Sequence, residues 1–273
     1  FCIVPFVRGR EVCRDADEIV SEVRELAERG AQEVTLLGQN VNSYGLGRHA
    51  GDPNAVSFPR LLRRLSEETA IQRIRFTTSH PKDLSDELID EFRVNAKLAS
   101  HFHLPVQSGS DAVLERMYRG YTRAEYLEKA RRLREARPDL ALGTDMIVGF
   151  CGETEEEFQA SMDLLEELRY DSIYSFVYSE RPKTTAGLYF KDDVPSEVKE
   201  ERLQRLQALQ NRIGWEKNRS YEGKILEVLV EGVSRSGDSY AGRSSQNHVV
   251  HFDGAEDDVG RILKVKVTHA GAN

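Results

Sequence analysis

The sequence has few of the features that mark membrane or secreted proteins. No run approaches the roughly 20 apolar residues that a membrane span needs, and Phe1 to Phe6 lead into charged residues rather than a signal peptide. Three cysteines, Cys2, Cys13 and Cys151, are too few for a disulfide scaffold. We therefore expect a cytoplasmic protein that has no membrane partner.

Positive charge is also in short supply. The chain carries 38 Lys and Arg against 46 Asp and Glu, for a net charge of −8. A chain this acidic is a poor general binder of polyanions, so any role with nucleic acid depends on a local surface. Its 273 residues, 39% hydrophobic and 31% charged, are typical of a folded protein with a barrel-sized core and a small second domain.

The first two-thirds of the chain alternates the patterns of strands and helices. Buried-type strands are predicted over 33–38, 72–77, 101–106, 140–150 and 172–178. Amphipathic helices are predicted over 15–29, 58–68, 85–92, 111–118, 122–137 and 154–169. Five strands joined by helices favour a parallel sheet with right-handed crossovers, short of the eight strands of a full barrel. A sixth strand is expected just before Phe1, because the chain lacks an initial Met and looks like part of a longer protein.

The last part of the chain changes pattern. A polar helix with a stripe of leucines is predicted over 195–218. Alternating apolar runs then follow over 225–230, 248–252 and 262–267, separated by turns rich in Gly and Ser. Such runs are typical of a small antiparallel barrel. We place a first domain over 1–215 and a second over 216–273.

Glycines and polar residues follow the predicted parallel strands, at the end where α/β barrels hold their active sites. Glycine lets the backbone approach a ligand, the amides of Gln39 and Asn40 can orient one, and Gly149 begins a turn into a helix whose N-terminus can hold an anion. Arg119 lies between two helices, where it can pair with a carboxylate. Each motif alone also fits an ordinary loop. The candidate site residues are Gly38, Gln39, Asn40, Ser79, Gln107, Ser108, Arg119, Asp145 and Gly149.

A histidine pair offers an alternative. His101 and His103 point to the same face of a predicted strand, so both imidazoles can reach one metal ion. His80 and Asp145 are further candidate ligands. This pattern predicts, as the runner-up, a metal-dependent barrel hydrolase, although no histidine–carboxylate set follows at a familiar spacing.

Together these segments resemble the radical S-adenosylmethionine methylthiotransferases. The stretches that carry the resemblance are FCIVPFVRGRE, LLGQNVNSYG, RFTTSHPKDL, HFHLPVQSGSD, MYRGYTRAEY, TDMIVGFCGETEEEF and FVYSERP. GQN and TTSHP look most like the MiaB-type branch, which acts on N6-isopentenyladenosine in tRNA. Other branches act on threonylcarbamoyladenosine or on a ribosomal-protein aspartate. Cys151 stands where Pro is usual in the family, and Cys13 where Ser is usual.

The resemblance implies a fold and cofactors. The fold is α/β, a partial (β/α)6 radical-SAM barrel followed by an OB-like antiparallel barrel, the TRAM domain. The family binds a 4Fe-4S cluster through Cys-x3-Cys-x2-Cys, and Cys2 falls on the third cysteine, so the first two would precede Phe1. A second, auxiliary 4Fe-4S cluster belongs to a further N-terminal domain. One cysteine cannot hold such a cluster, so we expect this chain alone to be inactive.

The resemblance also implies a reaction and partners. S-adenosyl-L-methionine, bound at the open iron, gives a 5′-deoxyadenosyl radical that removes hydrogen from C2 of the adenosine at tRNA position 37, and a methylthio group takes its place. The candidate site residues are expected to surround the cofactor and the target base. The expected partners are the tRNA anticodon arm, held by the TRAM-like segment, and an electron donor such as flavodoxin or ferredoxin. A third interpretation is a fragment that binds RNA without catalysis.

Overall fold

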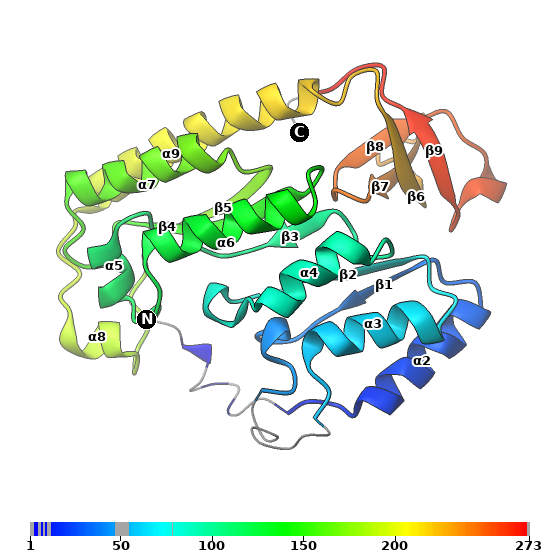
Figure 1. Ribbon diagram of the computed structural model, residues 1–273. Coiled ribbons are helices and arrows are strands. Elements are labelled where there is room, and N and C mark those ends of the chain that lie inside the picture. The colour runs from blue at the N-terminus through cyan, green and yellow to red at the C-terminus, as the bar shows by residue number, and fades with distance from the viewer. Residues whose placement is uncertain are drawn as a thin grey trace.

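The computed structural model describes residues 3, 4, 7, 9, 12–46, 55–77 and 79–271. Cys2, the predicted cluster ligand, lies outside the described residues. Figure 1 shows a larger α/β part, a long helix along one side, and a small antiparallel sheet at one end. None of the described helices is long and apolar enough to cross a membrane.

All five predicted parallel strands are present. They form a two-stranded sheet, β1-β2, and a three-stranded sheet, β3-β4-β5, which meet at a parallel bridge between Ile74 and Leu98. The strands are β1 (Glu33–Leu36), β2 (Arg73–Phe76), β3 (His101–His103), β4 (Ala141–Val148) and β5 (Ser172–Val177). This arrangement confirms the predicted partial barrel.

Helices cover one face of these strands (Figure 1). They are α2 (Ala16–Glu28), α3 (Phe58–Glu68), α4 (Asp86–Val94), α5 (Asp111–Arg116), α6 (Arg123–Ala136) and α7 (Glu155–Leu168). Thr122 and Thr154 begin α6 and α7 with capping boxes, which satisfy backbone N–H groups at the helix start. Between helices and strands lies the core, where the Phe76 ring meets Phe58, Phe92 and Phe102 edge-on at 5.0 to 6.0 Å.

Two further helices follow β5. The short α8 (Thr185–Tyr189) was not predicted, because a single turn shows no apolar period; the Thr184 hydroxyl caps it by accepting from Gly187 N. The long α9 (Ser196–Arg219) was predicted, and it packs against β5 and α7. The described loops also contain the short 3-10 helices η1 (Val41–Ser43), η2 (Pro81–Asp83) and η3 (Glu256–Asp258).

The C-terminal part is an antiparallel sheet in the order β8-β7-β6-β9. Its strands are β6 (Ile225–Val233), β7 (Tyr240–Ser244), β8 (Val249–Phe252) and β9 (Ile262–Lys266). Strand β7 was missed because its sequence, YAGRS, lacks an apolar alternation. The predicted boundary between 215 and 216 falls within α9, and this division of the chain stays a prediction.

Two buried arginines join the sheets. Arg73 and Arg75 both pair with Glu33, and their side chains are only 5% and 6% exposed. Arg73 also donates to the carbonyls of Glu227 and Arg243, and Arg75 to those of Ser244 and Ser245. Because Arg73 and Glu33 begin their strands, the C-terminal sheet abuts the end of the barrel opposite to the candidate site.

Candidate functional site

The loops after β1 and β2 are tied to each other at the carboxyl ends of the strands. The Asn42 amide donates to His80 O at 3.0 Å and accepts from His80 N at 2.8 Å. Asn40 Nδ2 donates to Asp83 at 2.5 Å. Burial, with the Arg119 charge nearby, lowers the pKa of His80 to about 4, so the imidazole is neutral near pH 7. The first two loops therefore form one rigid rim.

This rim carries buried polar atoms with no partner among the described residues. They are Asn40 Oδ1 and Ser79 Oγ. A buried polar atom left unpaired costs free energy, so its presence at a strand end suits contact with a ligand. Gly38 and Gln39 are exposed beside them. The structure thus brings four of the predicted residues to one edge.

The chain after β3 is held in an unusual conformation. Gln107 has a left-handed backbone (φ 75°), and its backbone N donates to Asp145 O at 2.9 Å while its carbonyl accepts from Ile147 N. Arg119 supports this segment rather than pairing with a carboxylate, because it donates to Pro105 O at 3.0 Å and to the Tyr121 hydroxyl at 2.9 Å. Gln107 lies at the rim, and Arg119 lies behind it.

Ser108 faces the interior. It is fully buried, and its hydroxyl lies 3.3 Å from that of Ser161 on α7. The next residue, Gly109, donates to Ser161 Oγ at 2.8 Å, and a Cβ at Gly109 would lie 2.3 Å from Ala160 O. This loop therefore docks closely on α7, and the structure does not place the Ser108 hydroxyl with the other candidate groups.

The face of the strands turned away from the helices carries His101, His103 and Asp145. His103 Nε2 lies 2.9 Å from Asp145 Oδ1. His101 is more deeply buried, and its Nδ1 has no partner among the residues that the structure describes. Burial, and then the Arg75 charge, lower its pKa to about 3. His80 instead packs against Tyr121 on another loop. Among the described residues no group of three His, Cys, Asp or Glu could hold a metal ion, so the hydrolase alternative gains no support.

Gly149 forms a turn that α9 covers. Its φ is 70°, and its backbone N donates to Glu153 Oε2 at 2.7 Å. Arg202 Nη1 lies 3.0 Å from both the carbonyl and the carboxylate of Glu153. The Lys199 stem packs on Gly149, where a Cβ would lie 2.3 Å from Lys199 Cγ. Burial raises the pKa of Glu153, and Arg202 opposes that shift.

Sequence reasoning missed Glu153, Lys199 and Arg202. Arg202 and Glu153 are 49 residues apart, and nothing in either local pattern indicates their contact. The usable signal was the pair Lys199 and Arg202, two cations three residues apart on a helix whose sequence is mostly polar. Because that helix also has to bury one face, some of its charged side chains could be expected to be buried.

The described cysteines do not fit an iron–sulfur cluster. Cys13 is free and exposed, while Cys151 is free and buried, with its pKa raised by burial. They belong to different loops, and neither lies in a Cys-x2-Cys or Cys-x3-Cys arrangement with another described cysteine. The described residues therefore offer no cluster site.

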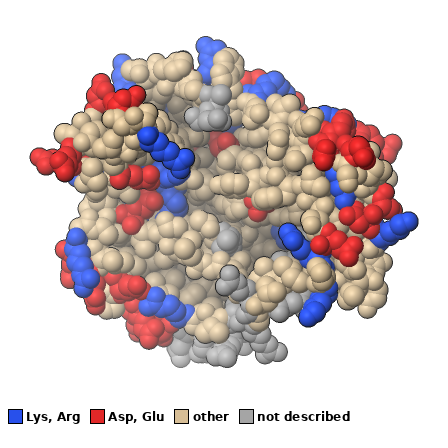
Figure 2. Space-filling model, turned by 180° about the vertical axis from the view of Figure 1, so that it is seen from behind, with Lys and Arg blue, Asp and Glu red and all other residues tan. Residues whose placement is uncertain are grey.

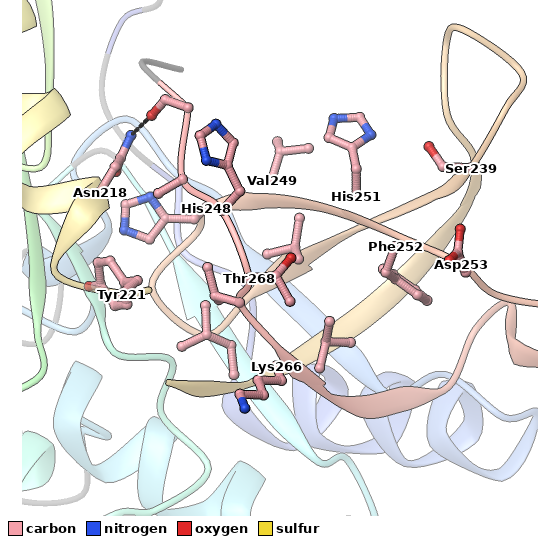
Figure 3. Close-up of a pocket in the computed structure, with 17 residues that line it drawn as sticks. Asn218, Tyr221, Ser239, His248, Val249, His251, Phe252, Asp253, Lys266 and Thr268 are labelled. Atoms are coloured by element: carbon pink, nitrogen blue, oxygen red, sulfur yellow. Dashed lines mark hydrogen bonds between the residues drawn. The ribbon is translucent and has the colours of Figure 1, made fainter. Parts of the chain in front are cut away.

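A pocket opens between the outer strands β8 and β9 of the C-terminal sheet (Figure 3). Tyr221 and His248 lie at one end, with ring centroids 4.9 Å apart, and Phe252 and Asp253 lie at the other. The His248 Nε2 atom is buried without a partner among the described residues. At about 760 Å³ the pocket is within the range of sites for small ligands.

Known proteins resemble the chain along its whole length. A relative from Syntrophotalea carbinolica, named tRNA-2-methylthio-N(6)-dimethylallyladenosine synthase, is 52% identical and covers 100% of this chain. Relatives of the same name from Geobacter sulfurreducens and Myxococcus xanthus are each 53% identical, over 98% and 100% of the chain. The chain spans 61%, 59% and 58% of the lengths of these three relatives. A solved methylornithine synthase is more distant, with 19% identity and a TM-score of 0.45, covering 73% of this chain and 56% of that one.

Two family models match. Residues 219–273, which include the C-terminal sheet, match the TRAM domain. Residues 1–165, which include β1 to β4, match the Radical SAM superfamily, whose members use a 4Fe-4S cluster and S-adenosylmethionine. Because that match spans more than half of the 273 residues, the chain belongs to the radical SAM superfamily.

Proposed function

We propose that this chain is the barrel and RNA-binding part of a tRNA methylthiotransferase. The reaction adds a methylthio group to C2 of N6-isopentenyladenosine at tRNA position 37. The observation that carries the proposal is the match to relatives named for this nucleoside at 52 to 53% identity, through both the radical SAM and the TRAM segments.

The rim supports a site for S-adenosylmethionine. Asn40 Oδ1 and Ser79 Oγ are buried, have no partner in the part of the chain that the structure describes, and lie close to exposed Gly38 and Gln39, which suits the polar groups of this cofactor. When bound at an iron–sulfur cluster, S-adenosylmethionine supplies the radical chemistry that replacement of an unactivated C–H bond needs. The residues of this chain bind and orient the cofactor, and the turn at Gly149 closes the opposite side.

Further parts of the proposal concern the longer protein. Cys2 would ligate the cluster with two preceding cysteines, and an N-terminal domain would hold an auxiliary cluster. An electron donor such as flavodoxin or ferredoxin would reduce the cluster. The site of action would be the cytoplasm, where tRNA is modified.

The C-terminal sheet is the proposed grip on the anticodon arm. Its pocket offers the rings of Tyr221, His248 and Phe252 beside Lys266. Aromatic and imidazole rings stack on the unpaired bases of RNA loops, and this contact does not need a strongly basic protein. That agrees with a net charge of −8 for the whole chain.

A substrate panel tests the function. The full-length gene product, with its clusters reconstituted, is incubated with S-adenosylmethionine, a reductant and one of three substrates: anticodon stem-loops carrying N6-isopentenyladenosine or threonylcarbamoyladenosine, or the ribosomal protein. Mass spectrometry should find a methylthio group on the isopentenyl nucleoside only. Product on either other substrate would transfer the assignment to that branch of the family. RNA binding without product on any substrate, from protein with full iron content, would favour a non-catalytic RNA-binding protein.

A further inference from the structure

Two aromatic side chains stand exposed on the inner face of the barrel. Tyr174 and Phe176 are 59% and 52% exposed, and they lie on β5, an outer strand of the three-stranded parallel sheet. The alternate residues Ile173, Ser175 and Val177 are less exposed, as expected for the strand face that α9 covers. The two rings therefore point to the side away from α9.

Polar groups border these rings. Asp145 is the cross-strand partner of Tyr174, and Ile147 that of Phe176. The His103 ring lies 5.9 Å from the Tyr174 ring and contacts Asp145, whose side chain remains 27% exposed. We call Tyr174, Phe176, Asp145 and His103 the inner-face platform.

Gly143 keeps this platform open. It lies between His103 and Ser172 in the sheet. A Cβ at this position would be 2.9 Å from Ser172 Oγ and 3.4 Å from His103 Cδ2. A Cβ would therefore displace the Ser172 hydroxyl, and a longer side chain would reach the His103 ring. Seen from behind, the molecule is hollowed in the middle, and Lys, Arg, Asp and Glu gather mainly around that hollow (Figure 2).

We propose that the inner-face platform binds the target base of the RNA. The proposal rests on the proposed function and names the residues that would receive its substrate. Exposed aromatic residues on a sheet are a common way to stack unpaired bases, worth about 1–3 kcal/mol per base. An ionised carboxylate only accepts hydrogen bonds, so Asp145 would accept from the N–H at position 6 of adenine. His103 would act as a positioning residue that fixes the Asp145 rotamer.

The platform lies next to Gln107 of the rim, whose backbone N donates to Asp145 O, and one stretch of strand away from the turn at Gly149. Asp145 precedes Gly149 by four residues of an extended strand, about 13 Å along the barrel. The C-terminal sheet, proposed to grip RNA, abuts the beginning of β3 and β4, where Ser245 Oγ accepts from Ser100 N and Gln246 Nε2 donates to Asp139. The platform thus lies between the turn at Gly149 and the C-terminal sheet. We assign Asp145, predicted from sequence as part of the cofactor shell, to the target base because the exposed Tyr174 is its cross-strand partner.

Fluorescence of 2-aminopurine tests the stacking. The chain is titrated into an anticodon stem-loop with 2-aminopurine at position 37, and stacking on the rings should quench the signal several-fold. Tyr174→Leu and Phe176→Leu should each lose most of the quench and weaken RNA binding about fivefold or more, which corresponds to about 1 kcal/mol. Tyr189→Leu is the matched control, since this tyrosine is 78% exposed on α8, and it should behave as the wild type.

A second comparison tests the base edge. The wild type should bind a stem-loop with adenosine at position 37 several-fold more tightly than one with purine riboside, which lacks the 6-amino group. Asp145→Ala should bring the ratio of these two affinities close to one. Asp90→Ala, at an exposed acid on α4, should leave the ratio unchanged. A purely structural role of Asp145 would weaken both RNAs equally.

The outcomes separate this inference from the proposed function. If the RNA binds but the 2-aminopurine fluorescence is not quenched, the platform does not bind the base, while the proposal that the chain binds RNA stands. The same conclusion follows if the variants change neither the quench nor the ratio of the two affinities. If the variants lower the affinity for S-adenosylhomocysteine and leave RNA binding intact, the platform belongs to the cofactor and the inference is overturned. If the chain does not bind the stem-loop at all, both proposals fall.

Discussion

At the scale of single residues, Gly149 and Gly152 look alike in the sequence and differ in the structure. Both have a φ near 70°, a conformation that costs an L-residue about 1–2 kcal/mol. Only Gly149 is also packed, because Lys199 lies against it with its ammonium bonded to Asp192 at 2.5 Å. Nothing lies within 4 Å of a Cβ built at Gly152.

This difference predicts unequal costs of alanine substitution. Gly149→Ala should lower the free energy of unfolding by about 1–3 kcal/mol more than Gly152→Ala, since it adds overpacking to the same backbone strain. Urea unfolding of the two variants measures the difference. Equal losses would show that Lys199 gives way and does not hold the turn.

A second prediction concerns His101. Its pKa is about 3 in the folded protein against an ordinary 6.5, first because it is buried and then because of the positive charge of Arg75. Between these two pH values the unfolded chain binds one more proton at this site. The free energy of unfolding therefore falls as the pH drops below 6.5, by up to about 1.4 kcal/mol per pH unit.

A variant isolates this contribution from other titrating groups. Between about pH 7.5 and about pH 5 the wild type should lose about 2 kcal/mol more unfolding free energy than His101→Leu. Urea unfolding of both proteins at the two pH values provides the comparison. Equal losses in the two proteins would mean that His101 also takes up a proton in the folded state over this pH range.

The candidate site residues show how far single positions could be predicted. Gly38, Gln39, Asn40, Ser79, Gln107 and Gly149 were placed correctly at strand ends, because parallel strands bring their carboxyl ends to one edge. Ser108 and Arg119 lie in the loops where they were predicted, but their side chains contact other parts of the protein. The Ser108 hydroxyl contacts that of Ser161, and Arg119 donates to Pro105 O. Local sequence cannot reveal such partners, because they come from other elements. The ligand roles of all these residues remain predictions.

At the scale of elements, α9 does more than link two domains. Arg202 is 5% exposed and its partner Glu153 is 1% exposed. The carbonyl and carboxylate of Glu153 both accept from Arg202, and the same carboxylate accepts from Gly149 N. Helix α9 therefore holds the turn that closes one side of the candidate cofactor site.

Removing this contact should be costly. Arg202→Ala leaves the buried Glu153 carboxylate without its cation and should lower the free energy of unfolding by about 3–5 kcal/mol. Arg212→Ala is the control on the same helix, because its pair with Glu166 is about half exposed, and it should cost less than about 1 kcal/mol. Chemical denaturation compares the two. Similar small losses would show that Glu153 is solvated or protonated without Arg202.

Element boundaries were predicted well where caps mark them. Helix α3 spans Phe58–Glu68 as predicted, after the Ser57 cap, and Ser85, Thr122 and Thr154 cap the next long helices. The predictions failed at α8 and β7, which have no apolar period of their own. Neighbours fix those two segments, β7 by pairing on both sides with β6 and β8.

At the scale of the whole molecule, the parallel order of the strands followed from the alternating pattern. The attachment of the C-terminal sheet could not be predicted from that pattern. Arg73 and Arg75 lie in a strand with no unusual sequence feature, and they donate to carbonyls about 170 residues away in the chain. That seam places the C-terminal sheet and the loops of the candidate site at opposite ends of the parallel strands.

The most direct test of this account is the tRNA of the organism that carries the gene. Nucleosides from total tRNA are compared by mass spectrometry between the parent strain, a strain with the gene inactivated, and that strain complemented with the full-length gene. The account predicts that inactivation removes the 2-methylthio derivative of N6-isopentenyladenosine, that the unmethylthiolated precursor accumulates, and that complementation reverses both changes. An unchanged amount of the methylthio nucleoside in the inactivated strain would contradict it.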